Sequence, residues 1–239
     1  MKILVIAAHP DDEILGMGGT IRKYTDAGNI VKIVIMATGI FARRSSNLTN
    51  SSGYSMTDKE VKIAELQLKE LRKDAKKAAK IVGVSDIEFL DFPDNEMDTV
   101  SNLQVTKSIE KIIEIFTPDI VYTHSQNDVN IDHRIIHNAT ITATRPMSNT
   151  SVKSVFSFEI PSSTEWYFNS PFSPNVFIDI SKELPKKIKA LEAYKSELRK
   201  YPHPRSKEGL EIIAKRWGTV SGFHAAESFC LIRELKKKI

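Results

Sequence analysis

An imidazole and three carboxylates follow directly on the first apolar run of the chain. The run ILVIAA at residues 3–8 is typical of a buried strand, and it stops at HPDDE, residues 9–13. Pro10 fixes its own φ and favours extended backbone at His9, which stiffens the turn. Histidine and carboxylate side chains are ligands of catalytic zinc, which keeps one position open for water. We therefore interpret this strand end as half of a catalytic metal site.

A second cluster of histidine and acid follows a later predicted strand. DIVYTH at residues 119–124 ends at His124, and the polar loop after it contains Asn130, Asp132 and His133. In a doubly wound parallel sheet strands 1 and 4 are neighbours, and ligands bind at their carboxyl ends. We therefore expect both clusters at one crevice, where two imidazoles and a carboxylate would hold zinc and a further carboxylate would accept a proton. The same ligands would also accept Fe²⁺ or Co²⁺.

The elements that position these side chains alternate between strand and helix. This order predicts an α/β fold in a single domain over residues 1–239, with a Rossmann-like, doubly wound, mainly parallel sheet and helices on both faces. Strands are expected at residues 2–8, 30–38, 86–92, 119–124, 154–160 and 175–180. Helices are expected at residues 13–28, 59–82, 101–116, 182–200 and 208–216, with one more that enters from the loop after residue 125 and stops at Pro146.

The composition excludes several classes of protein. Hydrophobic residues make up 41% and charged residues 27% of the chain, and the net charge is +4, as in ordinary globular proteins. Basic residues are not interleaved with aromatic ones, so we expect no nucleic-acid partner. No run approaches the roughly 20 apolar residues of a membrane span, and the short first run does not fit a signal peptide, so a cytoplasmic location is expected. Cys230, the single cysteine, excludes an intrachain disulfide and is expected in the core.

The two clusters also resemble a known family. AHPDDE at residues 8–13, paired with the acid and histidine after the fourth strand, is similar to the PIG-L/LmbE-like zinc-dependent de-N-acetylases. The resemblance runs over most of the chain and includes residues 71–84, 89–94, 123–134 and 224–233. It implies a metal-dependent hydrolase that removes the acetyl group from an N-acetylglucosamine-type sugar conjugate and releases a free amine and acetate.

The resemblance assigns a role to each residue of the motifs. His9, Asp12 and His133 would bind zinc, and Asp11 would be the general base that activates the attacking water. Asp132 is the second catalytic candidate, because in the family this carboxylate orients a neighbouring histidine; a plain helix cap is the alternative.

The chain departs from the family at one position. Many members have His-Pro-Asp-His where this chain has Asn130-Ile131-Asp132-His133, and the first histidine helps to stabilise the charged intermediate. Asn130 cannot carry a positive charge. Candidates for the missing charge are His124, His224 and an arginine such as Arg145.

Other polar side chains near predicted strand ends are candidates for binding the sugar. These are Arg43, Arg44, His124, Asn130, Glu159, Trp166 and His224. The two arginines lie in a polar stretch, residues 41–58, that is too long for an ordinary connection, and solvated loop arginines are the equal alternative. Glu159 and Trp166 suit hydrogen bonding and stacking on a sugar ring, and packing of the indole is the equal alternative.

Two further features have plain structural interpretations. Gly16, Gly18 and Gly19 lie inside a predicted helix, whereas a dinucleotide loop needs glycine directly after the strand, so close helix packing or backbone approach to a sugar is expected. His137 lies one helical turn after His133 and is expected to pack or to support the site.

Three other functions share parts of this pattern. A two-metal phosphoesterase would need more ligands than the two motifs supply, a sugar-binding protein would explain the absent histidine, and a nucleotide-binding dehydrogenase would need the glycine fingerprint. The expected partner is a small N-acetylated sugar conjugate, and the resemblance also allows a homo-oligomer.

Overall fold

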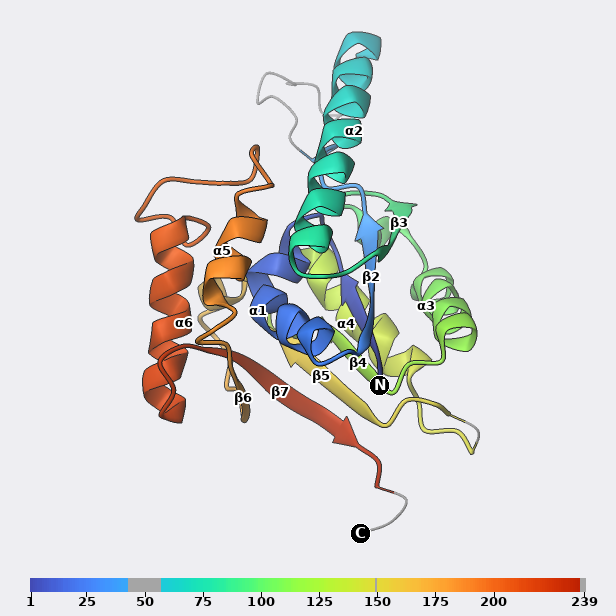
Figure 1. The fold of residues 1–239 in the computed structure, drawn as a ribbon. Helices are drawn as coiled ribbons and strands as arrows, with labels where there is room; N and C mark the ends of the chain where they lie inside the picture. Colours follow the sequence, from blue (N-terminus) through green and yellow to red (C-terminus); the bar gives the residue numbers. More distant parts are fainter. Residues whose placement is uncertain (43–56, 149, 237–239) are drawn as a thin grey trace.

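The computed structural model describes residues 1–42, 57–148 and 150–236, so most of the polar stretch 41–58 lies outside it. Seven strands form one sheet (Figure 1). In chain order they are β1 (Lys2–Ala7), β2 (Ile30–Ala37), β3 (Asp86–Phe92), β4 (Ile120–His124), β5 (Ser154–Phe158), β6 (Val176–Asp179) and β7 (Ala226–Glu234).

The strand order is β3-β2-β1-β4-β5-β7-β6. The first five strands of this order are parallel, and β7 runs antiparallel to both of its neighbours. Ile3 on β1 pairs with Val31 on β2 and with Ile120 on β4. The predicted α/β fold and the adjacency of strands 1 and 4 are therefore confirmed.

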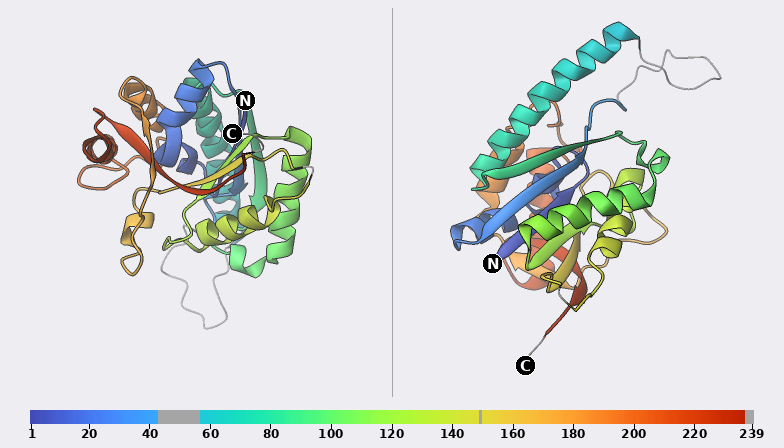
Figure 2. Two further views of the ribbon diagram at one scale, coloured as in Figure 1. Left: turned by 90° about the horizontal axis from the view of Figure 1, so that it is seen from below. Right: turned by 90° about the vertical axis from the view of Figure 1, so that its right-hand side faces the viewer.

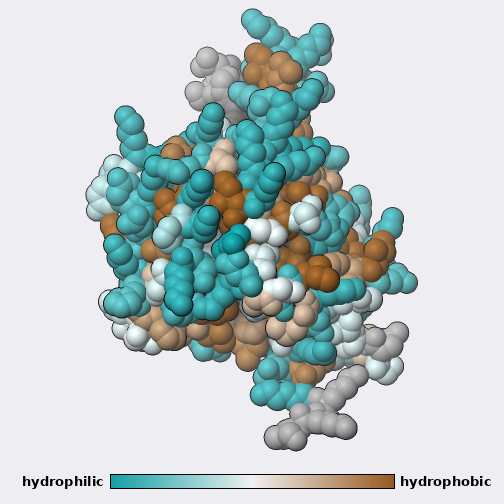
Figure 3. Space-filling view, in the orientation of Figure 1, coloured by the Kyte–Doolittle hydropathy of each residue, from teal (hydrophilic) through white to brown (hydrophobic). Residues whose placement is uncertain are grey.

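Helices cover both faces of the sheet. They are α1 (Asp12–Asp26), α2 (Asp58–Ile81), α3 (Asn102–Phe116), α4 (Ile131–Ala143), α5 (Leu184–Leu191) and α6 (Lys207–Ser221), with the short 3₁₀ helices η1 (Met97–Thr99) and η2 (Thr164–Trp166). Figure 2 shows α2 and the pair α3 and α4 on opposite sides of the sheet. The N-terminal end of α2 projects beyond the sheet and exposes Ile63 and Leu66, and a hydrophobic patch is visible at that end (Figure 3).

The alternation of side chains along each strand builds two hydrophobic cores. Ile3 and Val5 of β1 point into the core beneath α1, α2 and α5. Leu4 and Ile6 point to the other face, into the core beneath α3 and α4. Because β1 is buried on both faces, it is fixed firmly where its carboxyl end meets the HPDDE turn. None of the described helices has the length and apolar character to cross a membrane.

Helix α1 is bent where it passes over the sheet. Met17 has φ −149° and ψ 24°, which is not helical, so the amides just after the bend lose their partners within the helix. Glu227 on β7 accepts hydrogen bonds from Gly19 N at 2.9 Å and Thr20 N at 2.6 Å. Lys187 of α5 donates to the same carboxylate at 2.6 Å, with both side chains buried. This ion pair caps the second half of α1 and ties it to β7 and α5.

Two predictions from the sequence were wrong, and one strand was missed. The helix expected over 182–200 ends at Leu191, because Tyr194 turns inward and its hydroxyl donates to the buried carboxylate of Glu13. Strand β7 was not expected; its first half is buried on both faces and contains Glu227, so it lacks the alternation of an ordinary strand. Cys230 is half-buried rather than a core residue.

Candidate metal centre

The HPDDE turn lies between the end of β1 and the start of α1. Asp11 has φ 121°, in the left-handed region that a non-glycine residue rarely occupies, and strain of this kind recurs at functional sites. The amide of Asp11 donates to Glu13 at 3.1 Å, which holds the turn in place. Pro10 packs against Gly39, where an added Cβ would lie 2.9 Å from the proline ring. The turn therefore presents its carboxylates in one fixed arrangement.

The structure brings the three predicted metal ligands together. Asp12 Oδ2 lies 3.3 Å from His9 Nδ1 and 3.3 Å from His133 Nε2. A tetrahedral ion with bonds of ~2.0–2.1 Å would separate its ligand atoms by about 3.3 Å. Asp12 Oδ1 and His133 Nε2 are buried and have no hydrogen-bond partner among the described residues, an arrangement that a bound cation would satisfy. These side chains therefore fit a catalytic metal ion.

The electrostatics of the cluster fit a cation as well. Burial alone would lower the pKa of His133, but the charge of Asp12, the larger opposing cause, and the nearby carboxylate of Asp128 raise it to about 9. Burial would likewise lower the pKa of His9, but hydrogen bonds to carboxylates, with Asp12 the largest, raise it well above its usual value. Burial would raise the pKa of Asp12, but the charge of His133 holds it well below its usual range. Protons on the two imidazoles thus hold positive charge where a cation would bind.

Two carboxylates orient the imidazoles from behind. Asp132 Oδ2 lies 3.0 Å from His9 Nε2, and the same side chain accepts from the amides of Asn95 and Met97 at 2.7 and 3.1 Å. Asp128 Oδ2 lies 3.1 Å from His133 Nδ1. A carboxylate behind a ligating histidine fixes its tautomer and direction. Asp132 therefore orients His9, rather than a histidine at position 130. Asp128 was not predicted, although it is an acid in the polar loop between His124 and His133.

A second set of possible ligands shares His9. Its Nε2 atom lies 3.3 Å from Asp94 Oδ1 and 3.0 Å from Asp132 Oδ2. The oxygens of these two carboxylates already accept hydrogen bonds, including one from Ala42 N to Asp94 at 2.9 Å. The set with Asp12 and His133, whose buried atoms lack partners, is the better metal site.

Asp11 lines a pocket of about 310 Å³. The pocket is lined by His9, Pro10, Asp11, Gly39, Ala42, Asp94, Asn95, Asn130, Glu197, Arg199 and Arg205. Burial raises the pKa of Asp11 well above its usual value, and the charge of Arg205 opposes this shift. Arg205 Nη1 lies 2.9 Å from Asp11 Oδ2. Sequence reasoning missed Arg205, because the turn that carries it, residues 201–206, shows no motif beyond its prolines.

The three candidates for the missing positive charge do not supply it in this structure. His124 Nε2 accepts a hydrogen bond from Ala8 N at 2.7 Å, and burial and the charge of His133 lower its pKa well below the usual value, so it is neutral. His224 is exposed on the turn before β7, and Arg145 pairs with Glu110 on the surface. None of these side chains presents a cation to the pocket.

Of the remaining predicted residues, one lines the pocket and others lie elsewhere. Asn130 lines the pocket, caps α4 by accepting from Asp132 N at 2.9 Å, and donates to Asn95 at 2.9 Å. Glu159 is half-buried and accepts from the Trp217 indole, and Trp166 is half-exposed beside His203; neither lines this pocket. Arg43 and Arg44 lie outside the described residues.

The two structural interpretations also find their places. His137 Nδ1 lies 2.8 Å from the carbonyl oxygen of His124 and supports the strand end rather than the ligand set. An added Cβ at Gly16 would lie 2.6 Å from Phe158 Cδ2, and one at Gly19 would lie 2.9 Å from Ile180, so these glycines permit close packing of α1.

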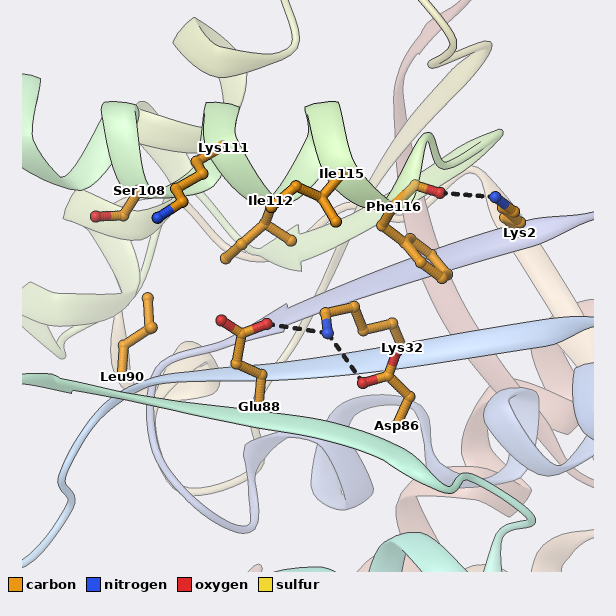
Figure 4. A pocket seen from close by; sticks show the side chains of 10 residues that line it. All are labelled: Lys2, Lys32, Asp86, Glu88, Leu90, Ser108, Lys111, Ile112, Ile115 and Phe116. Atoms are coloured by element: carbon orange, nitrogen blue, oxygen red, sulfur yellow. Dashed lines mark hydrogen bonds and ion pairs between the residues drawn. The ribbon is translucent and has the colours of Figure 1, made fainter.

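A separate hollow of about 320 Å³ lies between α3 and strands β1, β2 and β3 (Figure 4). Lys32 projects into it and pairs with Asp86 and Glu88 at 2.9 Å each. Lys2, the first residue of β1, closes one end by donating to the carbonyl oxygen of Phe116 at 3.1 Å. Both of its carboxylates pair with Lys32, and it contains none of the predicted site residues.

Comparisons with known proteins agree with the geometry. The chain matches the model of the PIG-L family, described as GlcNAc-PI de-N-acetylase, over residues 4–144, which include both clusters. It is 30% identical over 232 residues to diacetylchitobiose deacetylase of Thermococcus kodakarensis, covering 95% of this chain and 81% of that protein. It is 28% identical over 196 residues to a probable N-acetyl-alpha-D-glucosaminyl L-malate deacetylase 2 of Bacillus cereus, covering 82% and 83%. The structure of N,N'-diacetylchitobiose deacetylase from Pyrococcus horikoshii has the same fold, with a TM-score of 0.75, 24% identity and coverage of 97% and 83%.

Proposed function

Because the chain belongs to the PIG-L family of de-N-acetylases, we propose that it is a zinc-dependent hydrolase that deacetylates a sugar. Its substrate would be an N-acetylglucosamine-type conjugate, and its products a free amine and acetate. The named activities of the relatives support the reaction, and the placement of His9, Asp12 and His133 supports the metal. The observation that carries the proposal is the set of ligand atoms around Asp12, next to an open carboxylate at Asp11.

In this proposal His9, Asp12 and His133 hold the metal. When bound, the ion would supply Lewis-acid chemistry toward the acetamide carbonyl and toward an attacking water. Asp132 fixes His9, and Asp128 fixes His133, so that both imidazoles keep one direction and one tautomer.

Asp11 performs the proton transfers in this proposal. Its raised pKa makes the Asp11 carboxylate a stronger base than an ordinary aspartate. Asp11 takes the proton of the attacking water and returns it to the leaving nitrogen, so the sugar departs as an amine.

The pocket suits a polar ring rather than an apolar ligand. Asp94, Asn95 and Asn130 offer carboxylate and amide groups at its wall, which match the donors and acceptors of sugar hydroxyls. The whole chain, residues 1–239, would form one deacetylase domain. A homo-oligomer and the cytoplasmic location remain predictions, and the sugar-binding and phosphoesterase alternatives are outcomes of the experiment below.

The test is a hydrolysis screen with the metal-loaded protein. N-acetylglucosamine conjugates with neutral, lipid-like and nucleotide aglycones are incubated, and free amine is detected beside a matched series of phosphate esters. We expect amine release from at least one acetamide and no phosphate release. Turnover of phosphate esters alone would contradict the proposal, and tight binding of sugars without turnover would favour the sugar-binding alternative.

A variant separates the base from the metal ligands. Asp11→Asn is nearly isosteric and leaves His9, Asp12 and His133 in place, so zinc content should stay near that of the unchanged protein while turnover is lost. General base catalysis contributes about 10²–10⁴-fold, which sets the expected loss. Equal turnover by this variant would exclude Asp11 as the base.

A further inference from the structure

The two oxygens of Asp11 have different surroundings. Oδ2 lies 2.9 Å from Arg205 Nη1 in a hydrogen-bonded ion pair. Oδ1 has no hydrogen-bond partner within the described parts of the chain, and it is not fully buried. Since Asp11 lines the pocket, one oxygen is held by a cation while the other is open to the pocket.

The guanidinium that holds Asp11 is itself fixed from two sides. Arg205 Nε donates to Ser162 Oγ at 2.6 Å, and Ser162 is held through its amide, which donates to Glu165 at 2.6 Å. The backbone amide of Arg205 donates to His203 Nδ1 at 3.1 Å, and Ser206 begins α6 as its cap. The planar fork of an arginine loses little rotamer freedom per bond when it is held in this way. The contact to Asp11 is therefore a built feature of the fold.

Arg205 is also the cation directed at the base. The other arginine of the pocket, Arg199, donates to the backbone carbonyls of Ser196 and Leu198. Arg205 alone, among the arginines that line the described pocket, has an ion pair with a carboxylate of the HPDDE turn. Arg205 lines the same pocket as Asn130, which carries no charge.

We propose that Arg205 is the positioning residue of the general base. It fixes the Asp11 carboxylate by Oδ2 and thereby directs Oδ1 at the water that attacks the acetamide. The proton passes from that water to Asp11 and then to the leaving nitrogen, while Arg205 keeps its own protons. The inference rests on the proposed function, because it takes Asp11 as the base of the deacetylation.

Four variants of the full-length, metal-loaded protein test this role. Arg205→Gln removes the charge, Arg205→Lys keeps the charge but cannot reach both Asp11 and Ser162, and Arg205→Ala leaves space for added guanidinium. The matched control is Arg22→Gln, which removes an arginine of similar exposure whose ion pair, with Asp26, lies outside the pocket. Each variant is measured for kcat, KM, zinc content and melting temperature on the sugar that the unchanged protein hydrolyses best.

The expected result is a loss in kcat with little change elsewhere. Because a displaced catalytic group costs on the order of 100-fold, Arg205→Gln should lower kcat by about 100-fold with KM within about threefold. Arg205→Lys should lower kcat by about tenfold, because a lysine ammonium cannot replace a guanidinium that contacts both Asp11 and Ser162. Guanidinium should restore activity to Arg205→Ala, and zinc content should stay constant throughout. Arg22→Gln should behave like the unchanged protein.

Three results would overturn the inference. An unchanged kcat in Arg205→Gln would show that Asp11 needs no such support. A raised KM with unchanged kcat would show that Arg205 binds substrate instead. Joint loss of zinc, melting temperature and activity in both Gln and Lys variants, without rescue by guanidinium in Arg205→Ala, would show a merely structural role. Absence of deacetylation by the unchanged protein would refute the proposed function and with it this inference, whereas the other results refute the inference alone.

Discussion

Replacing Glu227 by glutamine should destabilise the protein strongly, although the residue is remote from the proposed chemistry. The carboxylate is 3% exposed and binds Lys187 Nζ and the amides of Gly19 and Thr20. Glu227→Gln leaves the Lys187 ammonium buried without its counter-charge. The glutamine NH₂ group, a donor, would also face the donors that the carboxylate now accepts from. Breaking a buried ion pair from one side costs about 3–5 kcal/mol. For a chain of this size that corresponds to a fall in melting temperature of about 6–20 °C.

Thermal unfolding with a chelator present measures this loss without a contribution from bound metal. The control Glu234→Gln lies on the same strand and pairs with Lys236 at the surface, so it should change stability by less than about 0.5 kcal/mol. The double variant Glu227→Gln with Lys187→Met should recover part of the loss, because it leaves no unpaired charge. A loss no larger than that of the control would refute the view that this ion pair caps the second half of α1.

Three further predictions concern the packing of α1 and the metal ligands. Gly16→Ala places a Cβ 2.6 Å from Phe158 Cδ2 and should lower the free energy of unfolding by about 1–3 kcal/mol in denaturant titrations; an unchanged value would contradict the close packing. The pKa of His133, raised from 6.5 to about 9, means that zinc must displace a proton at pH 7. Because the pKa of His9 is raised as well, zinc affinity should rise by at least about tenfold per pH unit up to pH 9 in calorimetry. The metal-free protein should lose the stability that the His133 proton supplies as pH rises from 6.5 through 9, and a flat profile would exclude this linkage. Asp132→Asn should weaken zinc binding by about 10–100-fold, because the carboxylate no longer fixes His9; unchanged affinity would deny it that role.

The sequence predicts the part of the site that depends on topology. HPDDE follows a strand with the apolar pattern of a buried one, and His133 follows a strand that the usual order places beside it, so the sequence alone assigns both clusters to one crevice. The structure confirms the α/β fold and brings His9, Asp12 and His133 together, and their role as zinc ligands remains a proposal.

Features formed by tertiary contact could not be predicted in this way. Arg205 contacts Asp11 from a turn nearly two hundred residues later in the chain. No hydrophobic periodicity or motif spacing predicts such a contact. Strand β7 could not be predicted because Glu227 is buried, where it accepts hydrogen bonds at the bend in α1. This buried acid breaks the alternation of apolar and polar residues that identifies a strand. Helix α5 ends early because the Tyr194 hydroxyl contacts Glu13, and local helix propensity cannot anticipate that contact.

The most direct measurement of the central claim is a zinc titration of chelator-treated protein, with released amine and acetate counted together. The account predicts that activity is absent without metal, rises in proportion to zinc and saturates at one ion per chain, with amine and acetate formed in equal amounts. His133→Ala should lose both zinc and activity under the same conditions. Full deacetylation by the metal-free protein, or saturation only at two ions per chain, would contradict the proposed site.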